Sequence, residues 1–298
     1  MTCNSTVGTK KIRKDVFSML KTVDFCGTEV TRLTIGNNPF SGHSYITDIV
    51  SGEEMMDYYT ADKITEALFA AEEAGINTYQ ALACPFILRV LRQYRNEGGK
   101  LKIIFQTYPA IDLRVNLRQM LAWEPFAIYH QGTMSDFLME SGETEKLKEN
   151  LKLIRETGVK VGFATHVPET VLQAEKEGWD VDFYMTCLYN ARRTQRGQTS
   201  GFITGKEKRL VFYPEDRFLM FDAIRKVKKP CIAFKLLAGG QVFYGKTPEQ
   251  YPQVISDVFT ETFSNIKPGD IATVGVYQKN ANQIKEDAMI LERVLNTL

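Results

Sequence analysis

Three histidines are the first residues in this chain that could carry out chemistry: His43, His130 and His166. Three imidazole groups can hold a zinc ion and leave one position open for water or substrate, and a single imidazole can transfer a proton. The three are not spaced as a compact ligand motif such as HExxH. Two alternatives therefore stay open. They form a metal site together, or each lines a site separately, with His130 and His166 in acid–base or ligand roles.

A lysine inside an apolar segment is the second candidate. Lys235 lies in PCIAFKLLAGG (230–240), where a buried ammonium group is costly unless it is paired or catalytic. It can form a Schiff base with a carbonyl substrate or bind the substrate's phosphate or carboxylate. The alternative is a lysine that points outward between helices. Cys187 could act as a nucleophile near a histidine, although a buried structural cysteine is commoner.

The alternation of short apolar segments with longer, helically periodic segments predicts the elements that position these residues. The expected strands are 31–36, 76–82, 101–109, 125–132, 159–166, 181–190, 230–240 and 270–278. The expected helices are 59–75, 87–98, 113–124, 144–158, 168–178, 214–229, 248–265 and 280–298. Thr60 is placed to cap the first helix, and Gly75, Gly98, Gly158 and Gly178 lie where helix C-caps belong.

Eight strand–helix units predict a (β/α)8 TIM barrel, and the nearly continuous apolar strands fit parallel strands buried on both faces. An open doubly wound sheet is the alternative, but IGNNPFSG after the first strand lacks the glycine spacing of a dinucleotide-binding turn. Two apolar patches in 16–30 predict a β-hairpin that closes the barrel floor. We expect one domain over 1–298, with the extension and hairpin in 1–30 and the barrel in 31–298.

The carboxyl ends of the barrel strands are where barrel enzymes build their active sites. All three histidines fall at or just beyond such ends. Polar side chains at the same ends, predicted to line a substrate site, are Asn38, Gln80, Gln106, Cys187 and Tyr189. The long connection 191–213 carries six lysines and arginines, which predicts either a solvated basic lid or a site for an anionic substrate.

Charge and composition limit the partners. The 298 residues include 37 Lys and Arg against 36 Asp and Glu, so nothing favours nucleic acid or an anionic membrane. No apolar run is long enough to span a membrane, and the start has no secretory h-region. Five cysteines without a CxxC pair fit a reducing compartment. We expect a cytoplasmic protein with a small-molecule substrate; its oligomeric state stays open.

Six segments in order resemble the aldo/keto reductase superfamily. They are VTRLTIGNNPFSG, ALFAAEEAGINTYQAL, VKVGFATHVPETVLQAEKEG, VDFYMTCLYN, AFKLLAGGQVF and DIATVGVYQKNANQIKEDAMIL. The resemblance implies a barrel, an oxidoreductase activity and NADP as cofactor. It also implies that Phe234 stacks under the nicotinamide ring, and that Lys279, Gln283 and Glu286 contact the 2′-phosphate and adenine.

The family's catalytic residues are mostly replaced. Gln80 stands where the family has its aspartate and Pro85 where it has its tyrosine, and the lysine position falls on Thr107-Tyr108. His130 alone has a counterpart. Tyr108 or Tyr277 would have to replace the missing acid.

Taken together, these residues predict an enzyme that acts on a small polar carbonyl or sugar-like substrate with non-standard catalytic residues. These are predicted to be His130, His166, Lys235 and Tyr108. One alternative is a metal-dependent hydrolase, isomerase or lyase that uses the three histidines with zinc or another divalent metal. Another is a non-catalytic barrel that binds NAD(P) or a metabolite.

Overall fold

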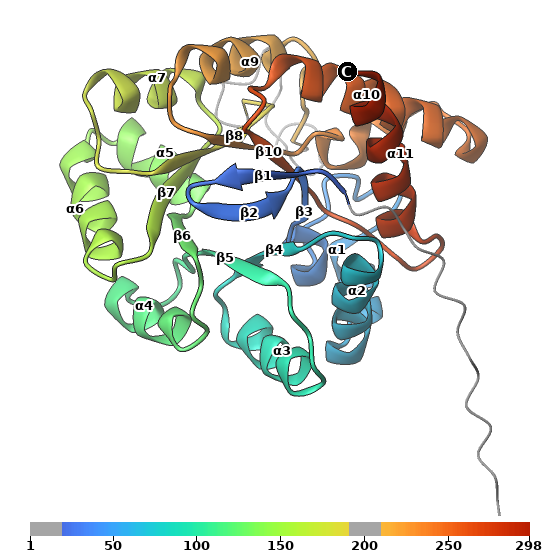
Figure 1. Cartoon of the computed structure of the whole chain (residues 1–298), viewed down its shortest axis with the longest axis horizontal. Coiled ribbons are helices and arrows are strands. Elements are labelled where there is room, and N and C mark those ends of the chain that lie inside the picture. Colours follow the sequence, from blue (N-terminus) through green and yellow to red (C-terminus); the bar gives the residue numbers. More distant parts are fainter. Residues whose placement is uncertain (1–19, 191–209) are drawn as a thin grey trace, which may run out of the picture.

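The alternation of strands and helices closes into a barrel. A computed structural model of the chain describes residues 20–190 and 210–298. Within these residues, eight parallel strands form a closed barrel in the order β10-β3-β4-β5-β6-β7-β8-β9, with helices around it (Figure 1). The predicted (β/α)8 TIM barrel is therefore confirmed. No helix in the described ranges is both long enough and apolar enough to cross a membrane.

The barrel strands are short and their bounds lie inside the predicted segments. They are β3 (Leu33–Ile35), β4 (Thr78–Leu82), β5 (Lys102–Gln106), β6 (Ala127–His130), β7 (Lys160–Thr165), β8 (Phe183–Cys187), β9 (Cys231–Phe234) and β10 (Ile271–Val274). The α-helices are α1 (Gly52–Tyr58), α2 (Ala61–Glu73), α3 (Pro85–Asn96), α4 (Leu113–Leu121), α5 (Gly132–Glu140), α6 (Thr144–Arg155), α7 (Pro168–Lys176), α9 (Asp216–Lys226), α10 (Tyr251–Asn265) and α11 (Gln283–Thr297). Short 3₁₀ helices are η1 (Asn38–Ser41), η2 (Ala238–Phe243) and η3 (Pro248–Gln250).

Local signals set several helix ends as predicted. The Thr60 side chain accepts a hydrogen bond from the backbone N–H of Lys63 and caps α2. Gly75 ends the same helix with φ +83°, a left-handed conformation that costs glycine little. Such ends let each helix turn back directly into the next barrel strand.

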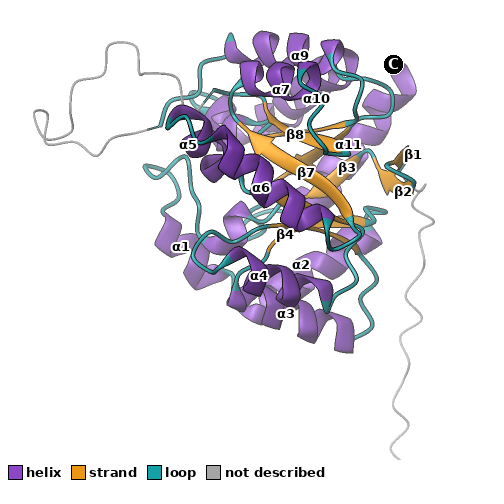
Figure 2. Cartoon of the chain, turned by 90° about the vertical axis from the view of Figure 1, so that its left-hand side faces the viewer, coloured by secondary structure: helices purple, strands orange, loops and turns teal. Residues whose placement is uncertain are grey.

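The predicted hairpin closes the amino-terminal end of the barrel. Strands β1 (Thr22–Phe25) and β2 (Thr28–Thr31) pair antiparallel, and their turn residues Cys26 and Gly27 have φ of +56° and +86°. Two consecutive positive φ values suit the tight turns that match the twist of a hairpin. Phe25 is fully buried and stands edge-on to Phe183 of β8, with 5.5 Å between ring centroids. Figures 1 and 2 show the hairpin lying across one end of the barrel.

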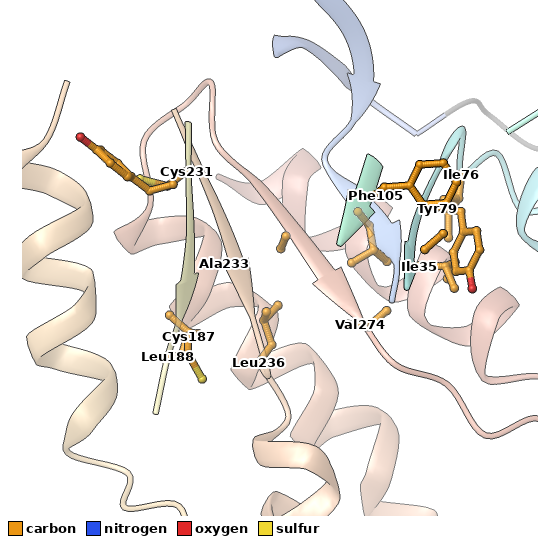
Figure 3. Packing of buried hydrophobic residues seen from close by; sticks show 14 of the residues in the cluster. Ile35, Ile76, Tyr79, Phe105, Cys187, Leu188, Cys231, Ala233, Leu236 and Val274 are labelled. Carbon is orange, nitrogen blue, oxygen red and sulfur yellow. The ribbon is translucent and has the colours of Figure 1, made fainter. Parts of the chain in front are cut away.

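Alternation along each strand decides which side chains face the helices and which face the lumen. Ile35, Tyr79 and Phe105 belong to the large outer cluster between strands and helices (Figure 3). Ala127 and Tyr129 of β6 belong to the inner cluster that also contains Phe25 of the hairpin. The residue after Tyr129 must therefore point outward, which decides the position of His130.

Four helical elements come in segments where the sequence predicts no helix: η1, η2, α1 and α5. The last is the most important because it adds a helix between β6 and α6. It begins after Gln131, whose side chain accepts a hydrogen bond from the backbone N–H of Met134. This short helix brings Asp136 to the carboxyl end of β7, beside Thr165 and His166.

Candidate active site

Lys235 lies at the carboxyl end of the barrel, directly after β9. Its φ is +61°, a left-handed conformation that costs a residue with a Cβ about 1 kcal/mol or more. The strand therefore ends at Phe234 and not at residue 240 as predicted. The ammonium nitrogen lies 3.2 Å from His166 Nε2. It also lies 4.6 Å and 5.2 Å from the ring centroids of Tyr45 and Phe212, so aromatic rings border the charge.

His166 connects Lys235 to a buried carboxylate. Its Nδ1 lies 2.7 Å from Oδ2 of Asp136, which is fully buried, and its backbone N–H donates to the same carboxylate. The Thr165 hydroxyl donates to Asp136 Oδ1 at 2.5 Å. A carboxylate can only accept, so the His166 proton belongs on Nδ1. The lone pair of Nε2 then faces the Lys235 ammonium group.

The charge on Lys235 is retained in spite of burial. Burial by itself would lower the pKa of Lys235, but its interactions with Cys187, Tyr45 and Asp136 outweigh this, so the pKa is raised. Lys235 is therefore an ammonium group at neutral pH, and Asp136 supplies the compensating charge. The site as built is a hydrogen-bonded series that runs from Asp136 through His166 to Lys235.

Tyr45 and Phe212 are held against Lys235 by the side chain of Gln241. Its Nε2 donates to the backbone carbonyls of Tyr45 (3.0 Å) and Leu210 (2.7 Å), and its Oε1 accepts from the Phe212 backbone N–H (3.1 Å). The Tyr45 hydroxyl accepts from Asn38 Nδ2 at 3.1 Å. One side chain therefore ties together loops that follow three different barrel strands.

His130, predicted to be catalytic, does not join this group. It faces outward from β6, where its Nδ1 lies 2.9 Å from Ser135 Oγ and its Nε2 accepts from Asn150 Nδ2 at 3.2 Å. Burial lowers its pKa from 6.5 to about 4. His130 is thus a neutral histidine with both ring nitrogens hydrogen-bonded, between the strand and helices α5 and α6.

The structure does not bring the three histidines together as the predicted metal site. His43 is exposed in the loop after η1, His130 lies outside the lumen, and His166 is engaged by Asp136 and Lys235. Among the described residues, no three His, Cys, Asp or Glu side chains are grouped so that they could hold a metal ion. His130 is apart from the other two because, although it is the last residue of β6, it directs its side chain toward the helices.

The predicted substrate-lining residues divide into two groups. Gln80 and Gln106 lie in the lumen, where Gln80 donates to Thr34 Oγ1 and Gln106 accepts from the Tyr129 hydroxyl, both at 3.0 Å. Asn38 lies in η1 at the mouth of the barrel, where its side chain donates a hydrogen bond to the Tyr45 hydroxyl.

Cys187 and Tyr189 form the second, fully packed group. Burial raises the pKa of the Cys187 thiol to about 11, so it is a neutral thiol and not a nucleophile at neutral pH. The Tyr189 hydroxyl accepts from Arg217 at 3.1 Å, and the residue is buried. Leu188 and Cys187 pack beside Leu236 at the ends of β8 and β9 (Figure 3).

The remaining predicted residues are dispersed. Tyr108 follows β5 and its backbone N–H donates to Asn116; its catalytic role stays a prediction. Two of the residues predicted to bind a nucleotide have partners within the chain: Lys279 Nζ lies 2.7 Å from a Glu54 carboxylate oxygen, and the Gln283 side chain accepts from the Tyr277 N–H. Glu286 lies in the first turn of α11. Phe234 stands edge-on to His166. NADP binding stays a prediction, and the basic residues of 191–209 lie outside the described ranges.

Asp136 and Tyr45 are the two site residues that the sequence did not reveal. Asp136 belongs to GTMSDFLME, where the buried residues include Gly132, Ser135 and Asp136 while Phe137 is exposed, so apolar periodicity does not mark the buried face. The glutamine before this segment, which caps the helix, was the available signal. Tyr45 lies in a long irregular loop, and no local pattern indicates that it turns toward β9.

Comparisons with known proteins support the fold and not the predicted family. No family model and no curated protein matches the chain. Three of the similar solved structures are each 11% identical to this chain. A 3-deoxy-D-arabino-heptulosonate 7-phosphate synthase from Thermotoga maritima has a TM-score of 0.51 and covers 94% of this chain and 91% of its own. A 3-dehydroquinate dehydratase from Geobacillus kaustophilus has a TM-score of 0.51, and the match covers 93% of this chain and 97% of the dehydratase chain. A dihydropteroate synthase from Xanthomonas albilineans has a TM-score of 0.52, and the match covers 94% of this chain and 98% of the synthase chain.

The aldo/keto reductase assignment is therefore wrong: the three structures described are two synthases and a dehydratase, and at this identity they show the fold alone. The segments that resembled this family are strand–helix pieces of the barrel. ALFAAEEAGINTYQAL is the helix α2, its glycine cap and the strand β4, and VKVGFATHVPE is β7 with the start of α7. The chain has the closed barrel fold that these enzymes also have.

Proposed function

We propose that this protein is an enzyme that acts on a small polar carbonyl or sugar-like compound, with Lys235, His166 and Asp136 at the carbonyl oxygen. The observation that carries the proposal is the hydrogen-bonded series Asp136–His166–Lys235, at 2.7 Å and 3.2 Å, at the carboxyl ends of β7 and β9. Barrel enzymes place their catalytic groups at these ends. A lysine whose pKa is raised, hydrogen-bonded to a histidine at this end of the barrel, also favours a functional site.

The three residues would have distinct roles. The Lys235 ammonium group donates a hydrogen bond to the carbonyl oxygen and stabilises the negative charge that develops there. His166 offers Nε2 as the acceptor that fixes the ammonium group, and it can pass a proton to or from Lys235. Asp136 holds the imidazole in the tautomer that keeps Nε2 available. Together they make the α-hydrogen of a bound carbonyl compound more acidic.

Schiff-base formation at Lys235 is the second candidate, and one contact favours it. His166 Nε2 is close enough to take a proton from the ammonium group, which would leave an amine that can attack a carbonyl carbon. The raised pKa of Lys235 argues for the first candidate, because a nucleophilic lysine needs the neutral form. Borohydride reduction separates the two, since only a Schiff base leaves a covalent adduct on Lys235.

The testing experiment can be run before the substrate is identified. A panel of small carbonyl compounds, including dihydroxyacetone, glyceraldehyde and pyruvate, is incubated with protein in D2O, and loss of α-hydrogen signals is followed by proton NMR. We expect the wild-type protein to accelerate exchange of at least one compound. Lys235→Met and Asp136→Asn should each lower the rate by about 100-fold or more, because each removes part of the charge stabilisation.

Two matched variants control for general damage. Lys228→Met removes an exposed lysine, and Asp222→Asn removes a half-exposed aspartate that pairs with Lys226; both should leave exchange unchanged. If wild type and Lys235→Met exchange every compound equally slowly, and borohydride leaves no adduct on Lys235, the proposal is wrong.

A further inference from the structure

We propose that Tyr45 is a second catalytic residue, which donates its phenolic proton to the same substrate oxygen that Lys235 contacts. The inference rests on the proposed function and adds a residue from a different loop. Tyr45 lies between η1 and α1, and the centre of its ring is 4.6 Å from the Lys235 ammonium nitrogen. Its hydroxyl group is the part that could take a role in the chemistry.

A tyrosine hydroxyl has one hydrogen and an oxygen that can accept two hydrogen bonds. At Tyr45 the oxygen accepts from Asn38 Nδ2 at 3.1 Å, and the Lys235 ammonium nitrogen lies 4.6 Å from the centroid of the same ring. One accepting position of the oxygen is therefore used, by Asn38. Across residues 20–190 and 210–298, no acceptor for its own hydrogen is found. The hydrogen is left to donate to a bound molecule.

The backbone around Tyr45 keeps this hydroxyl at the site. Gln241 Nε2 donates a hydrogen bond to the Tyr45 backbone carbonyl, and the centroids of the Tyr45 and Phe212 rings are 5.4 Å apart. Gly239 approaches so closely that an added Cβ would lie 2.5 Å from Tyr45 Cδ2. Such an arrangement fixes the ring, so the donor needs little reorganisation when a substrate binds.

The proton step is balanced without any further reagent. The phenolic O–H bond breaks as an O–H bond forms on the substrate oxygen, and the electron pair of the C=O π bond moves onto that oxygen. The α-carbon loses its hydrogen to solvent, and that C–H electron pair forms the C=C bond of the enol. Lys235 stabilises the phenolate that remains on Tyr45 until solvent returns a proton. Nothing is oxidised or reduced.

Tyr45→Phe is the direct test because it removes the hydroxyl and keeps the ring against Phe212 and Lys235. Tyr244→Phe is the matched control, since the Tyr244 hydroxyl donates to Asp48 in an exposed position away from Lys235. Using the compound that wild type exchanges fastest, we expect Tyr45→Phe to lower α-hydrogen exchange about 100-fold. Tyr244→Phe should stay within twofold of wild type, and thermal melting followed by circular dichroism should be the same for all three proteins.

The outcomes separate this inference from the proposed function. If Lys235→Met abolishes exchange and Tyr45→Phe stays within twofold of wild type, the function stands and the role of Tyr45 is overturned. Its role is overturned in the same way if Tyr244→Phe loses as much activity as Tyr45→Phe. If wild type equals Lys235→Met on every compound, the proposed function fails, and the inference fails with it.

Discussion

At the scale of single residues, two buried histidines differ in whether their hydrogen-bond partners are charged. His166 sits between Asp136 and Lys235, so its ring nitrogens link two charged groups. His130 lies among neutral partners, Ser135 and Asn150, and has no charge to offset its burial. The sequence places both at strand ends, and only the direction of each side chain distinguishes the histidine of the site from the packed histidine.

The lowered pKa of His130 predicts a pH-dependent stability. The folded value is about 4 against 6.5 for the free side chain, so between these values the unfolded chain binds more protons. The free energy of unfolding should therefore fall as pH decreases from 6.5 toward 4, by up to about 3 kcal/mol from this group. Urea unfolding of wild type and His130→Gln at several pH values measures it.

The variant isolates the contribution of His130 because carboxylates titrate in both proteins. The difference in unfolding free energy between wild type and His130→Gln should shrink as pH falls through this window, since the variant has no imidazole to protonate. A constant difference from pH 6.5 to pH 4 would mean that His130 keeps an ordinary pKa in the fold.

At the scale of elements, the loop after β9 positions Tyr45. Gly239→Ala places a methyl group against the Tyr45 ring and should shift it away from Lys235, lowering α-hydrogen exchange about 10-fold or more. Gly245→Ala is the matched control: its φ is +72°, so it has the same left-handed cost of about 1 kcal/mol, but nothing lies within 4 Å of the added Cβ. NMR exchange rates and melting temperatures of both variants are measured. Equal exchange rates would contradict the positioning role of Gly239.

Elements with strong local signals could be predicted, and those defined by tertiary contacts could not. The helix α2 has a side-chain cap at Thr60 and a glycine end at Gly75, and its bounds lie within two residues of the predicted 59–75. The helix α5 is short and weakly periodic, so the aspartate that it carries was missed. A position at a strand end predicts that a residue lies near the barrel mouth. Neighbouring residues of a strand face opposite sides, however, so an error of one residue in the strand's position exchanges the lumen for the helix side, as at His130.

At the scale of the whole molecule, the hairpin seals the barrel floor. Phe25→Ala should lower the free energy of unfolding by about 3 to 5 kcal/mol, because Phe25 is fully buried in the inner cluster. Phe218→Ala is the control, since Phe218 is 57% exposed and its loss should cost well under 1 kcal/mol. Urea unfolding provides both values. A small effect of Phe25→Ala would show that the floor is dispensable.

The hairpin floor also sets the direction in which the molecule can be used. It covers the amino-terminal end of the barrel, with β1 and β2 at one side of the molecule (Figure 2), so a ligand reaches Lys235 from the carboxyl end. Gly27 and Glu29 of the hairpin are exposed. A tether attached at these residues would anchor the protein to a bead or an electrode with its mouth turned toward the bulk solution. The closed amino-terminal end is therefore the end at which the protein can be attached without covering the candidate site.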